Sequence, residues 1–309
     1  MRVFVTGATG AIGGHAVPAL VRAGHEVTAL ARSGQKAAVL ADQGAHPVSV
    51  SLFDARALAT AFSGMDAVVN LASAMPSTLR FPLYRAWQET ERVRTEGSAA
   101  VAEAARTAGV GRLVQESVAM LYRPGGSTWI REDWPLDEYP QTRGNLAAEA
   151  SARRFTAAGG IGTVLRLGLF YGPGAAHAEQ LYALARKRIG VRFGPPGNYL
   201  SLIHLADAAR AVVAALTAPA GPFNVVDDEP LTQRAQLAAL ATAAGRTPLL
   251  RGPGRAGLLL GSRLTSLTRS LRVSNAAFRA ETGWAPRYPS ARAGWLATAA
   301  VLEQRIRQD

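Results

Sequence analysis

The sequence contains no cysteine, which excludes disulfide bonds, a thiolate nucleophile and zinc ligation by cysteine. Lysine is also scarce: Lys36 and Lys187 are the only two, and arginine supplies the rest of the 34 basic residues. A bilayer crossing needs roughly 20 apolar residues, but the longest candidate, residues 256–261, is followed at once by Ser262 and Arg263. We therefore expect a cytoplasmic protein without a targeting segment or a membrane partner.

The chain has 309 residues, of which 48% are hydrophobic, so it is long enough to bury a sizeable core. Its formal charge of +12 would usually indicate nucleic-acid binding. However, we find no basic helix with interleaved aromatic residues and no helix-turn-helix signature. We expect a small-molecule substrate and no nucleic-acid partner. The five histidines have no metal-ligand spacing, so no metal site is predicted.

Short runs rich in Val and Leu alternate with amphipathic stretches through the first two-thirds of the chain. This alternation predicts βαβ units and an α/β fold, a Rossmann-type doubly wound parallel sheet. After residue 170 the rhythm changes to Gly/Pro-rich loops and helices, which predicts a small, mainly helical C-terminal substrate subdomain. We assign residues 1–170 to the Rossmann-type domain, with 201–227 returning to it, and residues 171–200 and 228–309 to the capping subdomain. The predicted strands are residues 3–6, 26–31, 47–50, 67–71, 113–116, 163–167 and 223–226.

A glycine-rich turn lies between the first predicted strand and the first predicted helix. Glycine permits positive φ and close approach of the backbone to a pyrophosphate, and the following helix N-terminus offers free N–H groups to it. The strand before the turn and the helix after it are the context that a dinucleotide site requires. The predicted cofactor-binding residues of this turn are Gly7, Ala8, Thr9, Gly10, Ala11, Ile12 and Gly13.

The end of the second predicted strand bears on the choice of cofactor. An NAD site would place Asp or Glu there to bind the ribose hydroxyls, but the chain has Ala31, Arg32 and Ser33. Arg32 could pair with a 2′-phosphate through its guanidinium group. We therefore predict NADP rather than NAD, with Arg32 and Ser33 at the phosphate; the alternative is that Arg32 is a solvated loop residue and that NAD is bound.

With these features the chain resembles the short-chain dehydrogenase/reductase superfamily, in its extended, NAD(P)-dependent epimerase/dehydratase-like branch, over nearly its whole length. Residues 6–13 match the TGxxGxxG loop of that branch, and residues 171–174 resemble its YGPG turn. Residues 201–207, 223–225, 274–276 and 283–286 also resemble its later motifs. The resemblance implies that Leu71, Ala72 and Ser73 lie along the cofactor and that Leu52 contacts it. It also implies a possible homodimer.

The resemblance fails at the catalytic residues. The family uses a tyrosine as general acid, with its pKa lowered by a lysine four residues later. The residues four before Lys36 and Lys187 are Arg32 and Ala183, so the chain has no YxxxK. Tyr139 and Arg143 have the correct spacing and are our candidate pair. The alternative register, anchored on the following helix, puts Gln141 and Asn145 at the two positions.

Other positions of the family's catalytic set are changed as well. Val118 stands where the family usually has a hydroxyl, so only Ser117 before it remains as a candidate. Arg94 stands where an asparagine is expected. His177 falls in the region of the substrate loop and is the candidate for an unconventional acid. The predicted catalytic residues are therefore Tyr139, Arg143, Ser117 and His177.

Three functional hypotheses follow from an intact cofactor loop beside an altered catalytic set. We favour an NADP(H)-dependent oxidoreductase or epimerase acting on a small carbonyl or hydroxyl compound. The alternatives are a non-catalytic NADP(H)-binding sensor or assembly protein, and an isomerase or cyclase without net hydride transfer.

Overall fold

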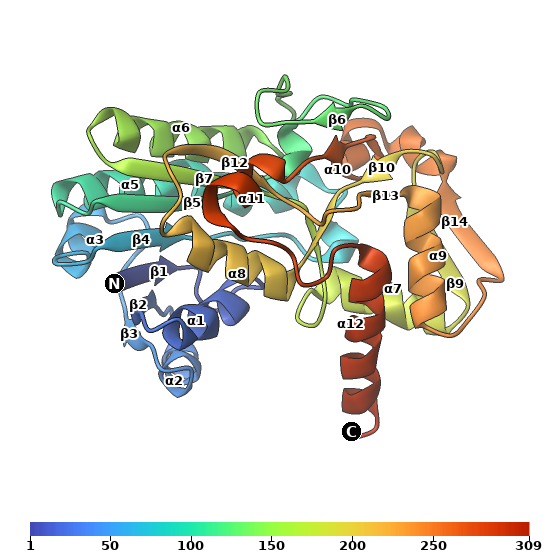
Figure 1. Cartoon of the computed structure of the whole chain (residues 1–309), viewed down its shortest axis with the longest axis horizontal. Helices are drawn as coiled ribbons and strands as arrows, with labels where there is room; N and C mark the ends of the chain where they lie inside the picture. Colours follow the sequence, from blue (N-terminus) through green and yellow to red (C-terminus); the bar gives the residue numbers. More distant parts are fainter. Residues whose placement is uncertain (309) are drawn as a thin grey trace.

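A seven-stranded parallel sheet forms the centre of the computed structural model, which describes residues 1–308 (Figure 1). The strand order is β12-β7-β5-β4-β1-β2-β3. Every residue of β4 is buried, which is why the Val-rich central strands read as continuous apolar runs rather than alternating ones. The predicted doubly wound α/β fold is confirmed. The strands span Arg2–Thr6 (β1), Glu26–Leu30 (β2), His46–Val48 (β3), Ala67–Asn70 (β4), Arg112–Val118 (β5), Ile161–Leu167 (β7) and Gly221–Val225 (β12).

Helices cover both faces of this sheet. One face carries α1 (Gly13–Arg22), α2 (Gly34–Asp42) and α8 (Leu205–Ala215), which pack around Leu20, Leu40 and Val212. The other carries α3 (Ala55–Ala61), α5 (Ser98–Thr107) and α6 (Arg143–Ala157), around Leu58, Val101 and Phe155 (Figure 1). Within residues 1–308, no helix combines the length and the apolar character that a bilayer crossing requires.

The strand order reverses between β1 and β4, because the chain passes from β1 to β2 and β3 and then returns to the other side of β1. Ligands of such sheets bind where the carboxyl ends of the strands meet at this switch point. Here that edge contains the glycine-rich loop after β1 and the segment after β4. The first part of α6 lies nearby, beyond the end of β5.

The helical segment before α5 is not one regular helix. It runs through η2 (Tyr84–Trp87), α4 (Gln88–Arg92) and a π-helical turn, η3 (Val93–Gly97), into α5. Two further short turns, η1 (Thr78–Arg80) and η4 (Ala119–Leu121), lie in the loops after β4 and β5.

The C-terminal part of the chain is mixed rather than only helical. Strand pairs that the sequence analysis did not predict join β8 to β11, β9 to β14, β10 to β13 and β6 to β15. The predicted domain boundaries stay predictions. The remaining elements are β6 (Trp129–Ile130), β8 (Leu169–Tyr171), α7 (Ala176–Arg186), β9 (Ile189–Phe193), β10 (Tyr199–Leu200), β11 (Leu202–His204), β13 (Leu231–Thr232), α9 (Gln233–Ala243), β14 (Leu250–Gly254), η5 (Arg255–Leu264), α10 (Thr265–Thr268), β15 (Arg272–Val273), α11 (Ala276–Thr282) and α12 (Ala291–Ile306).

Candidate active site

The loop after β1 requires glycine at two places. Gly7 has a φ of +66°, and a Cβ there would lie 2.3 Å from the carbonyl oxygen of Leu71. A Cβ on Gly13 would lie 2.3 Å from the carbonyl oxygen of Gly7. The loop is thus folded tightly against the end of β4 on one side and the start of α1 on the other.

The same loop presents amide groups to a ligand. The Gly10 amide donates to Gly7 O at 2.9 Å and the Gly14 amide to Gly10 O at 2.8 Å. The amides of Ala11, Ile12 and Gly13 donate to no group among residues 1–308, and the first turn of α1 carries neither an acid nor a side-chain cap. A helix N-terminus with free amides and no competing carboxylate fits a diphosphate group.

The segment after β4 adds a polar atom to this edge. The Oγ of Ser73 is buried and has no hydrogen-bond partner within the described chain. Beside it, the Ala72 amide donates to Asn70 Oδ1 at 3.3 Å. Since buried polar atoms normally have partners, Ser73 fits the predicted contact with a cofactor lying along Leu71 and Ala72.

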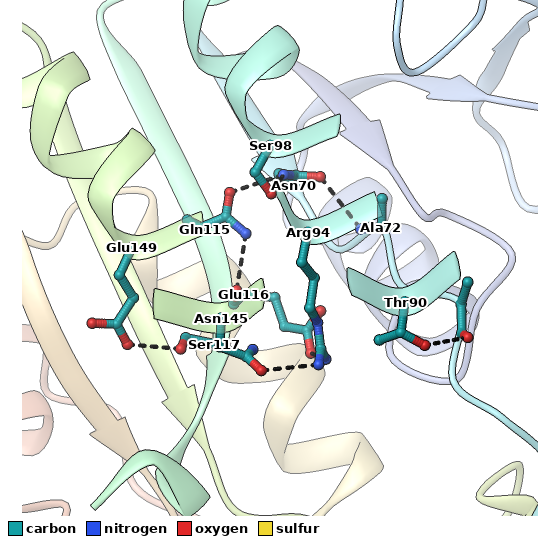
Figure 2. A network of polar contacts seen from close by, with 11 residues as sticks. Asn70, Ala72, Thr90, Arg94, Ser98, Gln115, Glu116, Ser117, Asn145 and Glu149 are labelled. Atoms are coloured by element: carbon teal, nitrogen blue, oxygen red, sulfur yellow. Dashed lines mark hydrogen bonds and ion pairs between the residues drawn. The ribbon is translucent and has the colours of Figure 1, made fainter. Parts of the chain in front are cut away.

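Asn70 fixes the end of β4 through contacts with three neighbouring elements, and Figure 2 shows Ser98 and Gln115 beside it. Its Oδ1 accepts from the Thr6 hydroxyl of β1. Its Nδ2 donates to Ser98 Oγ at 3.1 Å and to Gln115 Oε1 at 2.8 Å. This buried network holds the ends of β1, β4 and β5 in register beneath the cofactor edge.

The segment directly after β2, where the sequence analysis expects the ribose of the cofactor, contains no carboxylate. Ala31 is buried, whereas Arg32 and Ser33 are exposed, and Ser33 caps α2 by accepting from the Lys36 amide at 3.4 Å. Leu52 lies against the long helix, since a Cβ on Gly97 would come within 2.8 Å of its Cδ2.

The structure separates the two members of the predicted YxxxR pair. Tyr139 is buried, its hydroxyl donates to Met120 O at 2.9 Å, and burial raises its pKa. The cation beside its ring is Arg269, at 4.4 Å from the centroid. Arg143 is exposed and pairs with Glu138 at 3.1 Å and Glu91 at 3.8 Å. This geometry does not bring a phenol and Arg143 together as an acid couple.

The other two candidate catalytic residues also have their polar atoms engaged. Ser117 donates its hydroxyl to Glu149 Oε1 at 2.7 Å (Figure 2). Glu149 also accepts two hydrogen bonds from Arg166, at 3.0 and 2.8 Å. Nε2 of His177 donates to Phe170 O at 2.7 Å, and burial lowers the His177 pKa. No side-chain hydrogen bond or ion pair within residues 1–308 joins any two of the four predicted catalytic residues.

A buried charge cluster lies instead at the positions of the alternative register. Arg94, within the π-helical turn, donates from Nη2 to Glu116 Oε1 at 3.2 Å and from Nη1 to Asn145 Oδ1 at 2.9 Å (Figure 2). Side-chain exposure is only 5% for Arg94 and 4% for Glu116. Burial raises the Glu116 pKa, and Arg94 opposes this rise.

Several polar atoms at this cluster have no partner within residues 1–308. They are Nε of Arg94, Nδ2 of Asn145 and Oε1 of the nearby Gln141. The Arg94 contact fixes the orientation of the Asn145 amide, so its Nδ2 points away from the guanidinium. The sequence analysis identified Arg94 and Asn145 separately but did not predict their contact. The signal that could have indicated it is that both positions depart from the residue type usual in the family.

No group of three or more His, Cys, Asp or Glu side chains within residues 1–308 is arranged to hold a metal ion. The polar groups of the candidate site are amides, hydroxyls and the Arg94–Glu116 ion pair. Such a set is suited to an organic cofactor and substrate.

Comparison with known proteins gives consistent results. Residues 3–225 match the model of the NAD dependent epimerase/dehydratase family. A curated Streptomyces protein, 3-diazoavenalumate denitrifying reductase, is 36% identical over 315 residues, covering 95% of this chain and 99% of its own.

Two crystal structures share the fold at 24% identity and a TM-score of 0.78 each. One is the UDP-glucose 4-epimerase of Thermus thermophilus with NAD, covering 98% of this chain and 99% of its own. The other is the human epimerase family protein SDR39U1 with NADPH, covering 97% and 99%.

Proposed function

Because the chain belongs to the NAD-dependent epimerase/dehydratase family of NAD(P)-dependent enzymes, we propose that it is an NADP(H)-dependent reductase that removes nitrogen from a diazo carboxylate. The proposal rests on one observation. The carboxyl edge of the sheet fits a dinucleotide, and the site beside it lacks the tyrosine–lysine pair that serves the family as a general acid. The name of the Streptomyces relative supplies the substrate class.

The residues that would hold the cofactor are those of the edge described above. The free amides of Ala11, Ile12 and Gly13 suit the diphosphate, and Ser73 suits the part that lies along β4. Arg32, which forms no ion pair within the described chain, suits a 2′-phosphate. When bound, the nicotinamide supplies a hydride.

The altered catalytic residues agree with this reaction class. Reduction of a ketone leaves negative charge on oxygen, which a nearby acid must neutralise. When a diazonium carbon receives a hydride, a C–H bond forms, the C–N bond breaks, and its electron pair leaves with N₂. No oxyanion develops, so no proton donor is needed at that point. A Tyr139 hydroxyl bound to Met120 O with a raised pKa is compatible with such chemistry.

The direct test supplies NADPH and 4-diazoniobenzoate labelled with ¹⁵N in both diazo nitrogens, with an enzyme-free control for spontaneous reduction. We expect one ¹⁵N₂ released and one benzoate formed per NADPH oxidised, with deuterium from [4-²H]NADPH at the ring carbon. Reduction of a carbonyl panel without N₂ release would refute the proposal. Tight NADPH binding without turnover of either class would favour the non-catalytic alternative.

A further inference from the structure

Two segments distant in the sequence meet beside the candidate active site. Residues 75–84 follow the cofactor segment after β4, and η5 spans Arg255–Leu264. The Tyr84 hydroxyl and Ser262 Oγ are hydrogen-bonded, and the Arg263 guanidinium lies 5.7 Å from the centre of the Tyr84 ring.

Each segment is tied to a residue close in sequence to the buried charge cluster. Ala74 O, one residue before the first segment, accepts from the Thr90 hydroxyl on α4 at 2.5 Å (Figure 2). Arg263 O accepts from Gln141 Nε2, just before α6, at 3.3 Å. The two segments therefore form a rim next to the side-chain amide of Gln141.

The rim exposes large apolar side chains. Leu79 is 92% exposed and Leu259 is 88% exposed, and these two are the most exposed large hydrophobic residues of the described chain. Single exposed leucines are ordinary, but a group on two touching segments marks a binding surface. The other exposed members are Met75, Leu83, Leu258 and Leu260.

The charged residues of the rim are all positive. The sequence has no Asp or Glu between Asp66 and Glu89, or between Glu229 and Glu281. Four arginines lie in or beside the rim, and none forms an ion pair with another residue of the described chain: Arg80, Arg85, Arg255 and Arg263. Such a surface complements an apolar anion and would repel an identical surface of a second copy.

We propose that this rim is the substrate-recognition surface and that it selects an apolar carboxylate. The leucines cover the apolar body, and the Arg263 guanidinium binds the carboxylate beside the Tyr84 ring. This inference rests on the proposed function for the identity of the reacting diazo group. The binding of an apolar carboxylate to the rim does not depend on that function. It assigns specificity to Leu79, Leu259 and Arg263, which lie outside the cofactor edge.

The test measures binding, without turnover, of trans-cinnamate and its methyl ester to the NADP⁺-saturated protein by calorimetry. We expect cinnamate to bind at least tenfold more tightly than the ester, since only the acid offers a charge-assisted contact. Arg263→Gln should abolish that preference, and Leu79→Ser with Leu259→Ser should weaken both ligands about tenfold. Leu296→Ser on α12 and Arg307→Gln are the matched exposed controls and should change neither constant.

Equal affinity for acid and ester, or an unchanged preference in Arg263→Gln, would overturn the inference. Two other results would also overturn the inference: a dimer that the leucine variants convert to monomers, and leucine-dependent sedimentation with anionic phosphatidylglycerol vesicles. Either result would show that the rim binds a second copy of the protein or a membrane rather than a substrate. Because no step requires N₂ release, absence of diazo reduction with intact cinnamate selectivity would refute the proposed function alone.

Discussion

Replacement of Arg94 by methionine tests whether the buried ion pair is what allows Glu116 to be charged. Methionine keeps most of the apolar volume of the side chain but removes the donors to Glu116 and Asn145. A buried carboxylate without a partner is costly, so Glu116 is expected to take up a proton in the folded variant.

The size of the effect follows from the pH. A glutamate that ionises at about 4.3 in the unfolded chain costs about 3.7 kcal/mol to keep protonated at pH 7, and about 1 kcal/mol at pH 5. The lost contact of the Asn145 carbonyl adds about 1 kcal/mol. Because burial already raises the pKa of Glu116 in the wild type, these sums are upper bounds. We therefore expect Arg94→Met to lower the free energy of unfolding by at most about 5 kcal/mol at pH 7 and at most about 2 kcal/mol at pH 5.

The sign of the pH dependence follows from the proton on Glu116. The folded Arg94→Met variant keeps this proton, whereas the unfolded chain has released it at neutral pH. The stability of the variant is highest below the pKa of Glu116 in the unfolded chain, and it falls by about 1.4 kcal/mol per pH unit as the pH rises above that value. Urea unfolding at pH 5, 6 and 7, beside the wild type, measures this slope. The double variant Arg94→Met with Glu116→Gln should recover most of the loss at pH 7. A destabilisation independent of pH, or no recovery in the double variant, would refute the reasoning.

Three further outcomes are expected. Gly7→Ala should abolish NADPH binding in a fluorescence titration, because the added Cβ meets Leu71 O; Gly14→Ala, which meets nothing within 4 Å, is the control and should bind normally. Tyr139→Phe should lower stability by about 1 kcal/mol and leave kcat unchanged, since the hydroxyl contacts only a backbone carbonyl; a large loss of kcat would restore it as an acid. Arg32→Glu should weaken NADPH at least tenfold without weakening NADH, and an equal effect on both cofactors would place the 2′-phosphate elsewhere.

The sheet and the cofactor loop were predictable because their signals are local. A buried parallel strand needs a short apolar run, and a tight strand-to-helix turn needs glycine, so residues 3–13 indicate their own conformation. The confirmed strand positions differ from the predicted ones by only a few residues at each end. The short pairs such as β9 with β14 were not predictable, because each strand gains its partner from a distant part of the chain.

The candidate catalytic pair shows why correct spacing was insufficient. A helix brings side chains four residues apart close together on one face, but α6 begins only at Arg143, after Thr142 as its N-cap. Tyr139 therefore precedes the helix and turns toward Met120, while Arg143 turns to solvent. The contact of Arg94 with Asn145 joins two helices far apart in the sequence, so spacing within either one could not reveal it.

The π-helical turn at η3 has a consequence for the length of this segment. Such a turn holds one residue more than an α-helical turn, so deleting a single residue from Val93–Gly97 would leave a regular α-helical turn, with α4 and α5 close to their present relative orientation. A deletion within α5 itself would instead rotate everything before it by about 100°. Thr90 would then leave the Ala74 carbonyl, and the rim segment beyond it would lose its attachment. The residue count can therefore change by one at the π-helical turn, but it is fixed within α5, on which the position of the rim depends.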